Sequence, residues 1–155
     1  MPVDPHGWTI FCDDIRPEVG GKFSFMGVYR GIMFVHSDFP VTLPKFGLAI
    51  HYRVDFDDAR LGDVSVNIFL PGDGEREPSV QAVIPVSKMI VENDPASAVG
   101  DTFREFGFNV ILAPLTLKER GRVRVRAVGG AGVIKLGSIR VERGPTNGTP
   151  ATNPN

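Results

Sequence analysis

The sequence contains a single cysteine and a single tryptophan. One cysteine cannot form a disulfide within the chain, and Cys12 lies in an apolar run, where a thiol usually behaves as a small buried side chain. We therefore expect a reducing, cytoplasmic setting, with a fold held by its hydrophobic core alone. At 155 residues, the chain is long enough to bury one such core.

An excess of charge and a long apolar run are also lacking. The 17 Lys and Arg residues nearly cancel the 18 Asp and Glu residues. Because no net field would draw the protein to a polyanion, nucleic acid is not expected as a partner. No apolar run approaches the roughly 18 residues of a membrane helix, and residues 1–7 lack the pattern of a secretion signal. We therefore expect no association with a membrane.

Residues typical of strands and turns are abundant. The chain has 18 Gly, 13 Pro and 11 Phe, and its apolar runs are rich in Val and Ile. The clearest signal runs from Phe46 to Phe56, where apolar residues recur at every second position. A helix would repeat its apolar face about every 3.6 residues, so this alternation predicts a long strand with one buried face.

Other segments repeat the strand pattern. Residues 64–70 and 80–84 flank the turn residues Pro71 to Gly74 and predict a hairpin. An N-terminal hairpin is predicted from strands Trp8–Cys12 and Lys22–Tyr29, joined by a loop from Arg16 to Gly21. Further predicted strands lie at 31–36, 106–112, 123–127 and 134–141, with a turn at Gly129–Gly132. The segment Val86–Asn93 is the one place where we expect a short helix.

Eight to ten strands with at most one short helix indicate an all-β fold. We expect an antiparallel two-sheet β-sandwich of jelly-roll or immunoglobulin-like type, formed by residues 1–143 as a single domain. Residues 144–155 contain no large apolar side chain, so we expect them to form a disordered or loosely held tail.

Asp13, Asp14 and Glu18 form the first candidate site, because clustered carboxylates can supply oxygen ligands to a hard cation such as calcium. The alternative is that they are turn residues whose carboxylates accept backbone hydrogen bonds. The three histidines, His6, His36 and His51, lack the paired spacing of a zinc site, although the fold could gather them near Cys12.

Gly20-Gly21-Lys22 is similar to the end of a phosphate-binding loop, but Phe23 stands where such a loop needs Ser or Thr. The magnesium-binding hydroxyl is therefore missing. We expect neither a nucleotide nor any other cofactor.

Arg122, Arg124 and Arg126 form the second candidate site, because they alternate with apolar residues and share one face of a strand. They could protect an exposed sheet face from aggregation, or they could bind an anion or an acidic partner. No aromatic residues are interleaved with them, which disfavours single-stranded nucleic acid as the ligand.

The segment FCDDIRPEVGGKFSFMGVY at residues 11–29, followed by residues 39–54, resembles the opening of an uncharacterised bacterial family of short β-rich proteins. The family is classed as a domain of unknown function, and its shared pattern is FCDDIR…GGK…GVY. The resemblance implies a small intracellular bacterial protein with no assigned reaction. It supplies no site residues.

Two hypotheses for the function follow. The first is a non-enzymatic binding or assembly module, which presents loops and a sheet face to another protein or to a second copy of itself as a homodimer. The second is a metal-dependent hydrolase, with Asp13, Asp14 and nearby histidines gathered by loops. Because no catalytic signature is present, the sequence favours the first.

Overall fold

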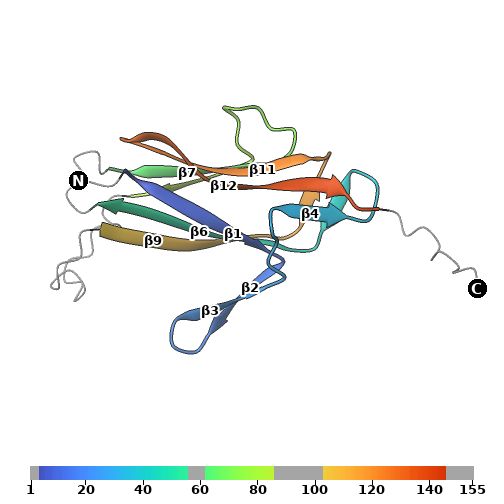
Figure 1. Ribbon diagram of the computed structural model, residues 1–155, viewed down its shortest axis with the longest axis horizontal. Helices are drawn as coiled ribbons and strands as arrows, with labels where there is room; N and C mark the ends of the chain where they lie inside the picture. Colours follow the sequence, from blue (N-terminus) through green and yellow to red (C-terminus); the bar gives the residue numbers. More distant parts are fainter. Residues whose placement is uncertain (1–3, 56–61, 86–102, 146–155) are drawn as a thin grey trace, which may run out of the picture.

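The computed structural model describes residues 4–55, 62–85 and 103–145, and every regular element in these ranges is a β-strand (Figure 1). The predicted all-β fold is thus confirmed for these ranges. They contain twelve strands rather than eight to ten. With no helix in this part of the chain, there is none that could span a bilayer. The helix expected at Val86–Asn93 and the tail from residue 146 lie outside the described residues.

The strands form four sheets. The three-stranded sheet has the order β1 (His6–Cys12), β6 (Phe46–Asp55) and β9 (Phe103–Leu112). The five-stranded sheet has the order β4 (Ile32–Val35), β12 (Gly132–Arg143), β11 (Gly121–Gly129), β7 (Val64–Phe69) and β8 (Val80–Ile84). The two small sheets pair β2 (Asp14–Glu18) with β3 (Lys22–Met26), and β5 (Val41–Leu43) with β10 (Leu115–Leu117).

One hydrophobic core joins the two larger sheets, which lie one above the other in Figure 1. On β6, Leu48 and Ile50 are fully buried in this core, and on β11, Val123 and Val125 are buried in the same cluster. Complete burial of such a side chain contributes about 1.5–3 kcal/mol. The strand predicted from the alternation after Phe46 is confirmed, with its apolar face inward.

The other face of β6 is buried at one end by the β2–β3 hairpin. Cys12, Ile15 and Ala49 form a second, smaller buried cluster there. A Cβ atom at Gly47 would lie 3.0 Å from both the Cys12 sulfur and Cγ1 of Ile15, so a glycine allows the hairpin to approach closely. The hairpin is thus anchored at its base and projects away from the sheets (Figure 1).

The predicted N-terminal hairpin is wrong in its pairing. β1 pairs with β6, and the hairpin is formed by β2 and β3 around Gly20 and Gly21, whose φ angles are 82° and 72°. Arg16 to Glu18, predicted as a loop, belongs to β2, where Pro17 lies opposite Phe23. A ribbon of two strands has free edges toward which a proline nitrogen can point, so Pro17 is tolerated.

Purely antiparallel sheets were predicted from the sequence, but the five-stranded sheet contains one parallel pair. β4 runs parallel to β12, with Ile32 opposite Arg140 and Val35 opposite Arg143. The other pairs in this sheet are antiparallel and include the predicted β7–β8 hairpin. The turn predicted at Gly129–Gly132 is confirmed, because it joins β11 to β12. β11 therefore lies in the middle of the sheet, between β12 and β7.

Candidate anion-binding site on the five-stranded sheet

The outward face of the five-stranded sheet is rich in cationic side chains. Val123, Val125 and Ala127 of β11 are buried in the core, so Arg122, Arg124 and Arg126 project from the opposite face, as predicted. Residues directly opposite each other on neighbouring strands share a face. Lys135 is opposite Arg126 and Arg140 is opposite Arg122, so both β12 residues lie on this outward face.

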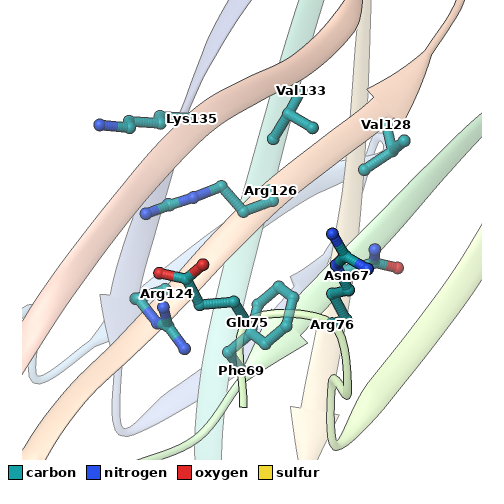
Figure 2. Close-up of a pocket in the computed structure, with 9 residues that line it drawn as sticks. All are labelled: Asn67, Phe69, Glu75, Arg76, Arg124, Arg126, Val128, Val133 and Lys135. Carbon is teal, nitrogen blue, oxygen red and sulfur yellow. The ribbon is translucent and has the colours of Figure 1, made fainter. Parts of the chain in front are cut away.

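A pocket of about 570 Å³ lies on this face (Figure 2). The residues that line it come from β7, β11, β12 and the loop between β7 and β8. They are Asn67, Phe69, Glu75, Arg76, Arg124, Arg126, Val128, Val133 and Lys135. Four cations and one carboxylate leave a formal charge of 4 − 1 = +3. An anion is therefore the ligand that its electrostatics favour.

Arg124 is held in place by two contacts. Its guanidinium carbon lies 4.9 Å from the centre of the Phe69 ring, and its Nη2 donates a hydrogen bond of 3.3 Å to the carbonyl oxygen of Asp73. Phe69 projects outward on β7 yet is buried. A cation over an aromatic face gains about 0.5–2 kcal/mol. Both contacts orient the guanidinium of Arg124 and leave its positive charge uncompensated.

Arg126 lies in an unfavourable environment for a cation. Partial burial lowers the pKa of Arg126, and the positive charge of Arg124 lowers it further. Arginine stays protonated in proteins, so the effect is an electrostatic cost rather than a loss of charge. Nη1 of Arg126 donates to the carbonyl oxygen of Val125 at 2.9 Å. An anion bound beside Arg126 would relieve the repulsion between the two arginines.

The loop between β7 and β8 is fixed by the carboxylate of Asp73. Its Oδ2 accepts hydrogen bonds from the amide of Leu70 at 2.8 Å, the amide of Ser79 at 3.0 Å and the hydroxyl of Ser79 at 2.7 Å. Burial raises the pKa of Asp73, but these hydrogen bonds and the charge of Arg124 outweigh it and hold the pKa below its ordinary value. The loop brings Glu75 and Arg76 to the pocket (Figure 2).

The cations of the pocket have no carboxylate partner in the part of the chain that the structure describes. Within the described ranges, Arg76, Arg124, Arg126 and Lys135 form no ion pair, and Glu75 forms none either. Some cations elsewhere in the described ranges do form ion pairs. Arg140 lies 3.3 Å from Glu142, and Arg143 lies 2.7 Å from Asp38. The pocket therefore gathers positive charge that its own side chains do not neutralise.

Arg122, the third residue of the predicted patch, lies outside the pocket. Its Nη1 donates to the hydroxyl of Ser138 at 3.3 Å. Of the predicted residues, Arg124 and Arg126 line the same pocket. Arg76 and Lys135 also line it and were not predicted from the sequence. The turn at Gly129–Gly132 was a signal for Lys135, because it sets the register of the β11–β12 hairpin and so places Lys135 opposite Arg126.

The carboxylates of the predicted metal site have different partners. Asp13 accepts a hydrogen bond from the hydroxyl of Tyr29, and burial together with Asp13 raises the pKa of Tyr29. Asp14 lies 3.1 Å from both Lys45 Nζ and Arg16 Nε. Hydrogen bonds from Lys45 and then Arg16 hold the pKa of Asp14 below its ordinary value. These partners engage one carboxylate oxygen of Asp13 and both oxygens of Asp14, which would compete with a cation.

The remaining candidate ligands are also engaged or exposed. Glu18 accepts a hydrogen bond of 2.8 Å from the hydroxyl of Ser24. His51 stacks on Trp8, with ring centres 4.9 Å apart, and its Nδ1 lies 3.3 Å from Glu105. His6 and His36 are exposed. Among the residues that the structure describes, no three His, Cys, Asp or Glu side chains lie close enough to hold a metal ion.

Comparisons with known proteins identify no family. No family model, curated protein or solved structure matches the chain. The resemblance to an uncharacterised bacterial family therefore stays a prediction.

Proposed function

We propose that this chain is a non-enzymatic binding module, a two-sheet β-sandwich that holds an acidic segment of a partner protein on its five-stranded sheet. The proposal rests on one observation, that Arg76, Arg124, Arg126 and Lys135 line a single pocket and form no ion pair within the described residues. Carboxylates are well suited to such a pocket, because an arginine can bind them through two parallel hydrogen bonds.

The lining of the pocket favours a peptide over a simple ion. Val128 is 36 % exposed and Val133 is 67 % exposed, so apolar surface lies beside the cations. A volume of about 570 Å³ is within the usual range of ligand pockets, about 300–1,000 Å³. A segment that combines acidic and apolar side chains would contact both kinds of surface.

Nucleic acid fits this site less well. Phe69, the aromatic residue of the pocket, is only 5 % exposed and lies under Arg124, so it offers no free face on which a base could stack. The chain as a whole carries a formal charge of −1, which would repel a polyanion at a distance. The four cations that line the pocket lie together on the outward face of the five-stranded sheet, where an acidic protein segment could reach them.

The sheet makes the site rigid. Arg124 and Arg126 project from β11, which is paired on both sides. Side chains on a central strand lose little further freedom when a ligand binds, because the backbone that carries them is already ordered. We therefore expect binding without a large change in the fold.

Titration of a fluorescent oligoglutamate peptide at low ionic strength tests the proposal. We expect Arg126→Gln to weaken binding about tenfold, since a charge-assisted hydrogen bond is worth about 1.5–3 kcal/mol. Arg122→Gln is the matched control, because it removes the same charge from the same face outside the pocket. It should change the affinity by less than about twofold, which is the scale of an exposed charge.

Equal losses for the two variants would mean that the peptide responds to general charge and would overturn the pocket assignment. No measurable binding to the wild-type protein at low salt would overturn the proposal as well. An RNA oligonucleotide with the same charge as the peptide tests the choice of partner, because tighter binding of the RNA would refute a protein ligand.

A further inference from the structure

The β2–β3 hairpin and the strand after it carry unusual apolar exposure. Eleven large hydrophobic residues are exposed in the described part of the chain, and six of them lie between Val19 and Phe34. Val19 at the hairpin tip is 93 % exposed, and Phe23 on β3 is 52 % exposed. Exposed apolar residues gathered in one region are typical of an interaction surface.

The hairpin also has an unpaired strand edge. β3 pairs with β2, and no other described strand pairs with β3. The hairpin projects from the body, so its outer edge is not covered by the two larger sheets (Figure 1). A two-stranded ribbon is marginally stable alone, and an exposed strand edge is a template for pairing with another chain.

The two edges of the hairpin differ in their suitability for pairing. Asp14, Arg16 and Glu18 lie on β2. If β2 paired with its own copy in antiparallel fashion about Arg16, Arg16 would face itself and Asp14 would face Glu18, which places like charges opposite each other. Pro17 also lacks an N–H group. β2 is therefore protected against self-pairing.

β3 has none of these obstacles. It carries one charged residue, Lys22, and no proline. Pro17 has no N–H group to donate, so it fits a strand pair only where its nitrogen points away from β3. Phe23 lies opposite Pro17 and therefore directs its own N–H and C=O groups away from β2, toward the free edge of β3. Phe25, two positions further along, does the same. The free edge of β3 thus presents donors and acceptors without repulsion.

We propose that β3 pairs antiparallel with β3 of a second copy of this chain and forms a symmetric dimer. The two-fold axis would pass beside Ser24, so that Phe23 lies opposite Phe25 of the second copy and Lys22 lies opposite Met26. Cross-strand aromatic pairs stabilise antiparallel sheets, and a lysine stem can pack on a methionine. The same register brings the exposed tip of one hairpin to Val28 of the other.

The apolar area that the dimer would bury indicates how strong it can be. The four side chains that the pairing would cover are Val19, Phe23, Met26 and Val28, which are 93 %, 52 %, 45 % and 54 % exposed. Each of these side chains would bury roughly 100 Å², which is about half the area of a large aromatic side chain. The two copies together would then bury on the order of 800 Å² of apolar side-chain surface. This lies below the standard size of about 1,600 Å² for a specific interface, so we expect a dissociation constant in the micromolar range.

Analytical ultracentrifugation over a series of protein concentrations tests the dimer. Phe23→Lys should raise the dissociation constant at least about tenfold, because a lysine on a strand edge opposes pairing. Phe34→Lys is a matched control, since Phe34 is also 52 % exposed but lies on β4. A wild-type protein that stays monomeric at every concentration, or equal effects of the two substitutions, would overturn the proposal.

Cross-linking tests the register. Ser24→Cys would place two cysteines opposite each other, and directly opposed residues in an antiparallel pair have Cα atoms about 4.5–5.5 Å apart, which suits a disulfide. The native Cys12 is fully buried and does not compete. We expect a dimer that reducing agent dissociates for Ser24→Cys and none for Ser37→Cys, an exposed control position. Equal cross-linking of both variants, or of neither, would refute the register.

The dimer and the acidic-peptide pocket use separate surfaces. Phe23→Lys should therefore leave the affinity for the oligoglutamate peptide unchanged, and the circular dichroism spectrum should show that the fold is intact. The two proposals can then fail independently, since one is measured by self-association and the other by peptide binding.

Discussion

Replacing Asp73 by alanine tests whether one carboxylate holds the loop that completes the pocket. The substitution removes the acceptor of three hydrogen bonds, from the amide of Leu70 and from the amide and hydroxyl of Ser79. Each contributes about 1 kcal/mol net, and water replaces part of this on a loop that is partly exposed. We expect the free energy of unfolding to fall by about 2 kcal/mol, or the melting temperature by about 4–8 °C.

Urea denaturation followed by circular dichroism measures this loss, and Glu77→Ala is the control. Glu77 is an exposed residue of the same loop, and its side chain forms no hydrogen bond or ion pair within the described residues. Its removal should change the stability by less than about 0.5 kcal/mol. Asp73→Ala should also weaken oligoglutamate binding, because Arg76 is carried by this loop and Arg124 donates to the Asp73 carbonyl.

The effect should depend on pH in one direction. The pKa of Asp73 is lowered in the folded state, so its contribution to stability is present above the unfolded pKa of about 3.9 and is lost as the pH falls through the folded value. The difference in the free energy of unfolding between wild type and Asp73→Ala should be constant near neutral pH. It should shrink toward zero in acid. A difference no larger than that of Glu77→Ala, or one that persists unchanged into strong acid, would refute the reasoning.

Three further predictions concern the core, the pairing of β1 with β6 and the base of the hairpin. Ile50→Ala should lower the free energy of unfolding by about 2–5 kcal/mol in urea, because Ile50 is fully buried between the two larger sheets, and a smaller loss would contradict that packing. Gly7→Ala should lower the free energy of unfolding by about 3 kcal/mol, because the added Cβ would lie 2.1 Å from the carbonyl oxygen of His51. A Gly7→Ala variant as stable as the wild type would show that β1 is not paired as described. Burial raises the pKa of the Cys12 thiol, so a thiol reagent should label it only in denaturant, and rapid labelling of the native protein would show that the hairpin base opens.

The sequence was informative wherever a segment has one buried and one exposed face. The alternation after Phe46 predicted β6, and the alternation through Arg124 and Arg126 predicted the outward face of β11. In both strands, burial of one face leaves a pattern at every second residue. The two arginines were therefore identified before their surroundings were known.

The pairing of distant segments could not be predicted, because periodicity describes a strand and not its partner. β1 pairs with β6 rather than with the strand that follows it, and the edge strand β4 runs parallel to β12. Pro17 was assigned to a loop, since a proline is excluded from a central strand and only the folded chain shows that β2 has a free edge. The first two errors concern segments far apart in the chain, and the third concerns whether a strand has a free edge, which periodicity does not describe either.

The position of Arg76 was hidden for a similar reason. It reaches the pocket through the loop that Asp73 holds, and the hydrogen bonds of Asp73 depend on the folded turn. A local signal did exist for Phe69, because Ile68 and Phe69 are adjacent apolar residues that break the alternation of β7. Two successive buried residues in a strand indicate that something covers both faces, and here Phe69 lies under Arg124.

The parallel pairing of β4 with β12 has a consequence for synthesis on the ribosome. Met33 and Val35 are buried on β4, but the neighbour of β4 in its sheet is the last strand described. While the chain grows from its N-terminus, this apolar edge has to wait until residues up to Arg143 have left the exit tunnel. Until then the nascent protein carries a hydrophobic strand without its partner, and this strand is the segment that a ribosome-associated chaperone would be expected to shield.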